Sequence, residues 1–409
     1  MKVTLVSPYH GGSHRAWASC YGATSRHEVE ILDLPARFWK WRMHGGAVTL
    51  ARRFMEHADR ADATAPGLIL ATDMLDLATF LALTRPATSA IPCVLYMHEN
   101  QLTYPLPEDP THGAMRRQQG ERDQQYAFIN FTSMLVADRV LFNSRYHLDA
   151  WFGALPAFLR HFPEYNELGA IEELRAKSEV LPVGIDTAAL DRAIPPAAGG
   201  GSGAATGDSA ATGDSAAMSD SAPLVLWNQR WEYDKNPSAF FEALFAAAEE
   251  GIPFRVALCG ERFSQRPQEF EVAIERLEGR IEHVGFAEPS HYARLLWDST
   301  VTISTAHHEF FGISILEAIH CRTFPVLPDR LSYPELLPQK ARERCLYSNR
   351  SELLERLRWA LLNANEAIRF AAEELVPHVA GYAWHRLAPI YDQVLETVVA
   401  GAPKPQVRR

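Results

Sequence analysis

The sequence predicts an α/β protein of two doubly wound, Rossmann-like domains that face each other across a cleft. The chain has 409 residues, which is too long for one ordinary domain and fits two of moderate size. In both halves, short and almost continuous apolar runs alternate with helical stretches, as in parallel strands that helices cover on both faces. One segment of low complexity separates the two series. Together these observations favour two parallel sheets joined by a linker.

The predicted strands follow one another along both halves. They are residues 3–7, 29–32, 68–71, 93–97, 140–142 and 180–183 in the first half, and residues 224–227, 255–259, 281–284, 301–304 and 324–327 in the second. A helix is predicted over residues 237–250, because Asn236 can serve as its N-cap and Pro237 fits its first position. Ligands of doubly wound domains bind at the carboxyl ends of the strands, so a site is expected in the loops that follow them.

Four segments are predicted along the chain. Residues 1–190 form the first domain, residues 191–222 a flexible linker, residues 223–380 the second domain, and residues 381–409 a helix that crosses back to the first domain, with a tail. The linker contains the hexamer ATGDSA twice in tandem and has almost nothing apolar to bury. A binding module built from these repeats is disfavoured, because each repeat is far too short to fold.

The composition limits the class of protein. Hydrophobic residues make up 47% of the chain and charged residues 22%, which is the balance of a globular protein. The formal net charge of −10 argues against a protein that coats nucleic acid nonspecifically, but it leaves room for a local basic patch. The five cysteines include no CxxC pair, so neither a disulfide framework nor a zinc ribbon is expected. Without a signal peptide or a membrane-spanning run, a cytoplasmic location is expected.

Two loops of the first half carry candidate site residues. Gly11 and Gly12 follow the first strand, where glycines let the backbone approach a ligand and open a helix N-terminus toward it. The pattern is not GxGxxG, so it is no dinucleotide fingerprint, and a plain tight turn would look the same. His98 follows the fourth strand, where it can act as a general base or bind a substrate hydroxyl. The alternative for His98 is a loop histidine without a role.

The second half carries a candidate diphosphate site. Arg230 and Lys235 flank the entry to the helix predicted from Pro237. Two cations beside a helix N-terminus suit a diphosphate, although a solvated loop with two cations is also common.

A pair of glutamates follows the fourth strand of that half. Glu309 lies on the loop and Glu317 lies within the next helix, and the amides of Phe311, Gly312 and Ile313 between them are expected to point at an anion. Glu317 stands among apolar residues, so its carboxylate needs a partner, for which a ribose hydroxyl pair is suitable. The alternative for Glu317 is an exposed charge on an amphipathic helix.

Together these residues resemble the retaining glycosyltransferases of the two-domain GT-B type. The resemblance rests on the E-x7-E pattern of Glu309 and Glu317, on Arg230 and Lys235 before it, on the glycine loop and on His98. The segments SPYHGGSHRAWA, LPARFWKWRMHGGA, YMHENQLTYP and LFNSRYH further resemble the tRNA-queuosine α-mannosyltransferases. This resemblance covers the chain except the stretch from residue 195 to residue 222.

The resemblance implies a reaction and a role for each site residue. Mannose would pass from GDP-mannose to a cyclopentene hydroxyl of queuosine, at the wobble position of a tRNA of the tRNA-Asp type, with retention of the anomeric configuration. Arg230 and Lys235 would neutralise the departing diphosphate, Glu309 would hold hydroxyls of the sugar, Glu317 the ribose, and His98 would contact the sugar near the reacting carbon. No metal is expected, because side chains and amides support the leaving group.

A basic and aromatic segment supports the expectation of a tRNA partner. Residues 36–53 contain no acidic residue. Cations for phosphates and aromatic rings for unstacked bases are what recognition of an anticodon loop requires. The candidate tRNA-binding residues are Arg37, Trp39, Lys40, Trp41 and Arg42, with Arg116 and Arg117 extending the patch. The alternative is ordinary packing of tryptophans against arginine side chains at the rim of a core.

Two other functions fit parts of the sequence. A GT-B transferase that acts on a cell-surface lipid or polysaccharide would need a membrane-facing basic and apolar helix, and the only candidate is the short segment 38–41. A non-catalytic tRNA-binding protein with a degenerate transferase fold is disfavoured, because Arg230, Lys235, Glu309 and Glu317 are all present. The sequence carries no signal of an oligomeric state.

Overall fold

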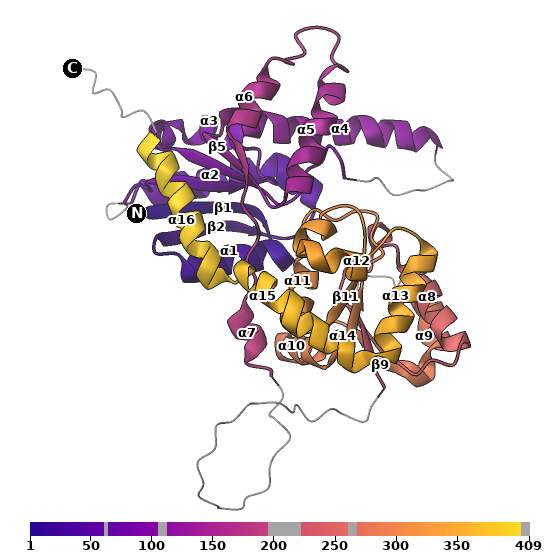
Figure 1. Cartoon of the computed structure of the whole chain (residues 1–409). Helices are drawn as coiled ribbons and strands as arrows, with labels where there is room; N and C mark the ends of the chain where they lie inside the picture. The colour runs from indigo at the N-terminus through magenta and orange to yellow at the C-terminus, as the bar shows by residue number, and fades with distance from the viewer. Residues whose placement is uncertain (61–63, 105–112, 195–221, 261–267, 402–409) are drawn as a thin grey trace, which may run out of the picture.

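The computed structural model describes residues 1–60, 64–104, 113–194, 222–260 and 268–401, and side chains from residue 124 onward in the helix that begins at residue 113. It contains two six-stranded parallel sheets, with the strand orders β2-β1-β3-β4-β5-β6 and β12-β11-β10-β7-β8-β9. Helices cover both sheets (Figure 1). The prediction of two doubly wound α/β domains is therefore confirmed. Among the described residues no helix combines the length and apolarity that crossing a bilayer requires.

The first domain is built on a sheet whose four inner strands are mostly buried and whose edge strands, β2 and β6, are partly exposed. Its strands are β1 Lys2–His10, β2 Glu28–Pro35, β3 Leu68–Thr72, β4 Cys93–Met97, β5 Arg139–Phe142 and β6 Ser178–Val180. Its helices are α1 Gly12–Thr24, α2 Trp39–Ala58, α3 Leu77–Thr88, α4 Gly113–Val136, α5 Arg145–Leu159 and α6 Ala170–Ala176. β3 and β4 are buried at every position, which explains their unbroken apolar runs.

The second domain repeats the plan. Its strands are β7 Leu224–Trp227, β8 Arg255–Cys259, β9 Ile281–Gly285, β10 Val301–Ile303, β11 Phe324–Pro328 and β12 Leu346–Tyr347. Its helices are α8 Pro237–Glu249, α9 Gln268–Arg276, α10 Pro289–Asp298, α11 Ile313–His320, α12 Arg342–Cys345, α13 Arg350–Leu362, α14 Ala364–Phe370 and α15 Val376–Val379. Short helical turns complete it: η1 Tyr233–Lys235, η2 Glu278–Arg280, η3 Tyr333–Leu336, η4 Gln339–Ala341, η5 Ala371–Leu375 and η6 Ala380–Tyr382.

Three local predictions differ from the structure. The strand predicted at 180–183 is the shorter β6, which ends at Val180, since Pro182 has no N–H to extend a ladder. The two-residue strand β12 was not predicted, because so short a run leaves no periodicity to detect. Asn236 does stand at the N-cap of α8, but its backbone is left-handed, with φ 51°, and its side chain makes no capping hydrogen bond.

Both ends of the predicted linker region contact the second domain, since Nε of Arg255 also donates to the carbonyl of Ala222 at 3.0 Å. The helix α7 Thr187–Asp191 contacts α10 and α11 of the second domain, and the indole Nε1 of Trp297 donates to the carbonyl of Leu190 at 2.9 Å. The predicted linker begins at residue 191, and its residues 195–221 lie outside the described residues.

The last helix, α16 Trp384–Gly401, returns to the first domain and packs on α1 (Figure 1). The indole Nε1 of Trp17 donates to the hydroxyl of Tyr391 at 3.1 Å, and the hydroxyl of Tyr21 donates to the carboxylate of Asp392 at 2.9 Å. Buried rings from both ends of the chain thus join one hydrophobic core, which continues into the second domain. This shared core stabilises the position of one domain relative to the other.

Candidate active site

The loops at the carboxyl ends of the two sheets meet each other. Arg230, after β7, donates from Nη2 to the hydroxyl of Tyr104 in the loop after β4, at 3.4 Å. The hydroxyl of Ser144, after β5, donates to the carbonyl of Phe310 in the loop after β10, at 2.5 Å. The predicted site residues of both domains therefore face one interdomain region, which is where doubly wound sheets bind their ligands.

Two hydrogen bonds fix the backbone of His98. Its N–H donates to Oδ1 of Asp73 at 3.0 Å, and its carbonyl accepts from Nδ2 of Asn143 at 2.7 Å. The imidazole packs edge-on against Trp17, with ring centroids 4.6 Å apart, and lies 4.4 Å from the ring of His14. The loop after β4 thus fixes the direction of the ring.

The histidines of this region are neutral at pH 7. Burial, together with His14 and His147, lowers the pKa of His98 well below its ordinary value of 6.5. Burial and the nearby Arg230 lower the pKa of His14 to about 4. Within the described part of the chain, Nε2 of His98 is buried and has no hydrogen-bond partner. A neutral imidazole with one free nitrogen can donate to or accept from a substrate hydroxyl.

Lys235 and Glu309 form a buried ion pair on the opposite side. Lys235 is 6% exposed, and its Nζ lies 3.2 Å from Oε2 of Glu309 and 3.2 Å from Oδ2 of Asp234. The same Nζ donates to the carbonyl of His308 at 2.8 Å. The charge of Lys235 and the N–H of Phe311, which donates to Oε1 of Glu309 at 3.2 Å, hold the pKa of Glu309 below its ordinary value despite burial. Glu309 is therefore an oriented carboxylate.

Arg230 is the more accessible cation. Half of its side chain is exposed, and Nη1 lies 3.1 Å from Oε2 of Glu232. Its charge acts on His14 and on Glu99, both in the first domain. Arg230 therefore lies where a diphosphate could touch both domains, whereas Lys235 serves in this structure to position Glu309.

Glu317 has a tyrosine as its partner. The hydroxyl of Tyr292 donates to Oε2 of Glu317 at 2.8 Å, and Nδ2 of Asn228 donates to that hydroxyl at 3.3 Å. Burial raises the pKa of Glu317 to about 7, although the hydrogen bond from Tyr292 opposes the rise. Glu317 and Glu309, at opposite ends of the E-x7-E pattern, thus have their pKa values moved in opposite directions.

The three glycines predicted for the site have different local surroundings. Gly312 caps α11 in the left-handed region, with φ 94°, and an added Cβ would lie 3.0 Å from Leu336. A Cβ on Gly11 would meet that of Ala36 at 2.4 Å, so close packing explains this glycine. Gly12 has φ 49° and open space around its Cβ position, and no side chain caps the N-terminus of α1. The α1 amides and the α11 amides at Gly312 and Ile313 remain candidates for an anion.

The basic and aromatic segment 36–53 includes the start of α2. Some of its side chains pack on neighbouring residues, and others are exposed. Trp39 packs on Tyr126, with centroids 5.2 Å apart, and Nζ of Lys40 lies 5.3 Å above the Trp39 ring. Trp41 is 65% exposed and Phe38 is 79% exposed. Arg42 donates from Nε to the carbonyl of Pro35 at 3.2 Å.

The predicted alternative of rim packing therefore applies to Trp39 and not to Trp41. Arg37 is exposed, whereas the side chains of Arg116 and Arg117 lie outside the described residues.

This surface adjoins the interdomain site. Trp39 and Tyr9 pack on a small core that contains Met74, the neighbour of Asp73. The ring of Tyr9 lies edge-on to that of His14, 5.9 Å away. A continuous path of side chains thus runs from α2 to the imidazoles beside His98.

Sequence reasoning missed several residues of the site. Tyr104 lies in the quoted segment YMHENQLTYP but received no role there, and no motif contains Tyr292. Glu335 accepts from the N–H groups of Arg145 and Tyr146 at 2.8 and 2.6 Å, so a carboxylate of the second domain binds the N-terminus of α5. Only the fold brings these partners together.

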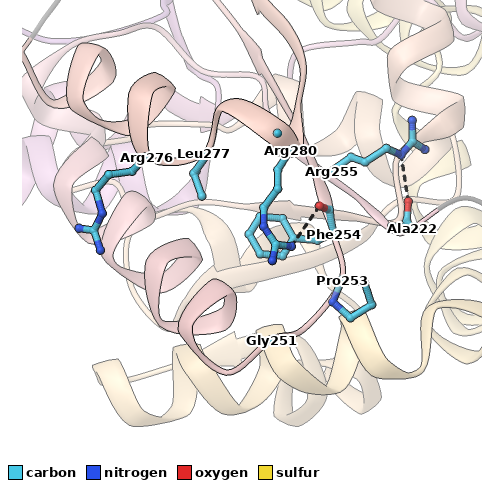
Figure 2. A pocket seen from close by; sticks show the side chains of 9 residues that line it. Ala222, Gly251, Pro253, Phe254, Arg255, Arg276, Leu277 and Arg280 are labelled. Atoms are coloured by element: carbon cyan, nitrogen blue, oxygen red, sulfur yellow. Dashed lines mark hydrogen bonds between the residues drawn. The ribbon is translucent and has the colours of Figure 1, made fainter.

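A separate hollow lies on the far side of the second sheet. It has a volume of about 510 Å³ and opens at the amino end of β8, between Arg255, Arg276 and Arg280 (Figure 2). Arg255 pairs with Glu282 at 2.9 Å, Arg276 pairs with Glu249 at 3.1 Å, and Arg280 donates to the carbonyl of Ile252 at 2.9 Å. These cations are already engaged, and the carboxyl ends of the strands lie elsewhere.

Comparisons with known proteins identify the family of the chain. Residues 2–185 match the family model of the tRNA-queuosine alpha-mannosyltransferase N-terminal domain, and residues 214–374 match glycosyl transferases group 1. A Drosophila melanogaster protein, tRNA-queuosine alpha-mannosyltransferase, is 30% identical over 392 residues, which cover 92% of this chain and 94% of the relative.

Solved structures share the fold. Sucrose-phosphate synthase from Thermosynechococcus elongatus superposes with a TM-score of 0.66 at 14% identity, over 98% of this chain and 99% of that one. Anabaena HepE in complex with UDP and glucose superposes with a TM-score of 0.62 at 13% identity, over 97% of this chain and 100% of that one. Both the family matches and these superpositions indicate the two-domain GT-B architecture.

Proposed function

Because the chain belongs to the family of tRNA-queuosine alpha-mannosyltransferases, we propose that it moves mannose from GDP-mannose to a cyclopentene hydroxyl of queuosine at the wobble position of tRNA, with retention of the anomeric configuration. The tRNA is of the tRNA-Asp type. The observation that carries this proposal is the contact of two loops of the second domain, which bear Arg230 and the oriented Glu309, with loops of the first domain, through Arg230 and Tyr104 and through Phe310 and Ser144.

The second domain binds the donor in this proposal. Glu317, held by Tyr292, accepts the ribose hydroxyls, and the amides at the start of α11 together with Arg230 face the diphosphate. Glu309 accepts hydroxyls of mannose, because Lys235 fixes its carboxylate and keeps it ionised. Preorganised groups of this kind stabilise the charge that develops on the departing diphosphate.

The first domain positions the acceptor in this proposal. In a retaining transfer without a covalent intermediate, the hydroxyl enters on the face from which the diphosphate leaves. The acceptor groups must then lie beside the groups that bind the diphosphate. Arg230 and its contact with Tyr104 support this, since they join the donor side to the loop after β4. The neutral His98 has a free ring nitrogen for a sugar or acceptor hydroxyl.

The α2 surface binds the anticodon region in this proposal. Phe38 and Trp41 offer exposed rings for unstacked bases, and Arg37 and Lys40 offer charge for phosphates. The packing of Tyr9 and Trp39 supports a path from this surface to the reacting groups. We also propose that the transfer needs no metal. A cytoplasmic location is proposed too, and the five free thiols support it, because a reducing compartment keeps thiols free.

The test uses GDP-mannose with a labelled sugar and bulk tRNA from cells grown with or without queuine, in the presence and absence of EDTA. We expect label only in the queuosine-containing tRNA, with no effect of EDTA. UDP-glucose is the matched donor control and should transfer nothing. Binding of GDP-mannose in a thermal-shift assay without label in either tRNA pool would overturn the acceptor, and loss of transfer in EDTA would overturn the metal-free mechanism.

A further inference from the structure

Two carboxyl groups lie side by side at the edge of the first sheet. Asp73 follows β3 and Glu99 follows β4, and these strands are paired in parallel with Thr72 opposite Tyr96. Oδ1 of Asp73 accepts the N–H of His98, the residue before Glu99, at 3.0 Å. Asp73 is 1% exposed, whereas Glu99 is half-buried and faces Arg230 of the other domain. His98 therefore lies between the two carboxyl groups: Asp73 accepts its N–H, and Glu99 follows it in the chain.

Like Glu317, these two carboxyl groups form no ion pair, whereas the other carboxylates near Arg230 and Lys235 do. In the second domain, Glu232 pairs with Arg230, and Asp234 and Glu309 pair with Lys235. Within the described part of the chain, no ion pair involves Asp73 or Glu99, and Glu99 accepts only from Nε2 of Gln101 at 3.0 Å. The imidazoles of His14 and His98 supply no charge, because burial keeps both neutral.

Burial without a cation is costly for a carboxylate. It raises the pKa of Asp73 well above its ordinary value, and the charge of Glu99 raises it further. Burial likewise raises the pKa of Glu99, against the attraction of Arg230. A bound cation would remove this cost for both groups.

Two orphaned atoms indicate that a ligand completes this region. Among the described residues, neither Oδ2 of Asp73 nor Nε2 of His98 has a hydrogen-bond partner, although both are buried. Buried polar atoms are nearly always paired in folded proteins, so an unpaired carboxylate oxygen and an unpaired imidazole nitrogen, on two residues joined by a hydrogen bond, call for a partner. The missing partner must carry hydrogen-bond donors and, to suit the carboxylates, a positive charge.

We infer that Asp73 and Glu99 form an anionic subsite for the secondary ammonium group of queuosine. The inference rests on the proposed function. In queuosine this nitrogen joins the cyclopentene diol to the deazaguanine and is protonated near neutral pH. It is bonded to the carbon next to a hydroxyl-bearing carbon, so a group that binds the ammonium must lie beside the group that receives mannose. Asp73 and Glu99 satisfy this, because they flank His98.

The subsite gives the enzyme a means of selecting queuosine. Guanosine, which occupies the same position in unmodified tRNA, has neither the ammonium nor the diol. Because burial raises the pKa of both carboxyl groups, a bound cation favours their ionised form, whereas a neutral occupant leaves the buried Oδ2 of Asp73 without a charged partner, which is specificity by an unpaired buried group. A divalent metal is the other cation that carboxylates attract, but within the described residues no group of three or more metal-ligating side chains is assembled there.

The test compares two competitive inhibitors of transfer to queuosine-containing tRNA. One is queuine, and the other is its ether analogue, in which an oxygen replaces the linking nitrogen and removes the charge. We expect queuine to inhibit the wild-type enzyme at least about tenfold more strongly than the ether. In Glu99→Gln and Asp73→Asn this ratio falls toward one, and kcat/KM for the tRNA falls by about tenfold or more. Asp33→Asn, a carboxylate at the end of β2 on the same sheet edge, is the matched control and keeps the ratio.

The possible results distinguish failure of the subsite from failure of the proposed function. If the wild type transfers mannose but does not distinguish queuine from the ether, the subsite is wrong and the proposed function stands. The subsite is equally wrong if Glu99→Gln keeps the wild-type ratio, or if EDTA abolishes the discrimination, which would assign the carboxylates to a metal. If the wild type transfers no mannose to queuosine-containing tRNA, the proposed function itself fails. A thermal-shift measurement of GDP-mannose binding by each variant checks that the variant, above all Asp73→Asn, is folded.

Discussion

The two glutamates of the E-x7-E pattern should respond to pH with opposite signs. Burial raises the pKa of Glu317 from 4.5 to about 7. The folded protein therefore keeps a proton on Glu317 that the unfolded chain loses between pH 4.5 and 7, so the free energy of unfolding falls as the pH rises through this window. Glu317→Gln removes this dependence, and its amide oxygen can still accept from the hydroxyl of Tyr292.

The size of the effect follows from the pKa difference. A change from 4.5 to about 7 corresponds to roughly 3 kcal/mol, at about 1.4 kcal/mol for each pKa unit. Glu317 is partly exposed, and solvent screening reduces this to roughly 1–2 kcal/mol. The free energy of unfolding of Glu317→Gln, relative to that of the wild type, should therefore be about 1–2 kcal/mol higher at pH 8 than at pH 5. Urea unfolding at both pH values measures the gain.

Glu309→Gln is the matched comparison. The pKa of Glu309 is lowered by Lys235, so its stabilising contribution is present above pH 4.5 and is lost as the pH falls below that value. This variant should be destabilised at pH 8 by less than the roughly 3–5 kcal/mol typical of a broken buried ion pair, because Asp234 still pairs with Lys235. If the difference in free energy of unfolding between Glu317→Gln and the wild type were the same at pH 5 and pH 8, burial would not be raising the pKa of Glu317.

Three further predictions concern other parts of the molecule. Arg230→Gln should raise the KM for GDP-mannose by about tenfold or more with little change in Tm, because its side chain is half exposed; steady-state kinetics and a melting curve check this. Trp41→Ala should weaken tRNA binding by roughly 1–3 kcal/mol in a filter-binding assay, whereas Val48→Ala, exposed on the same helix, should not. Asp392→Ala should lower the free energy of unfolding by about 2 kcal/mol or more, since Tyr21, Ser25 and the N–H of Arg26 lose their acceptor; a wild-type urea midpoint would contradict it.

The sequence predicted what is encoded locally. Strands such as β3 and β4 are buried on both faces, so their apolar runs are unbroken and easy to detect. The family resemblance implied that Lys235 and Glu309 touch the donor. The structure adds that Lys235 is buried between Asp234 and Glu309, a contact that no spacing rule contains. Tyr104 was missed because its partner, Arg230, lies 126 residues away in the chain.

One chain of contacts across the domain boundary connects the candidate site residues of the two domains. The carbonyl of His98 accepts from Asn143, whose neighbour Ser144 donates to the carbonyl of Phe310, the residue after Glu309. Glu335 of the second domain holds the start of α5 in the same region. The orphaned nitrogen of His98 and the oriented carboxylate of Glu309 are therefore fixed in one frame by backbone hydrogen bonds. Since a small displacement of reacting groups is costly in rate, this interdomain contact would position the catalytic groups of the proposed function.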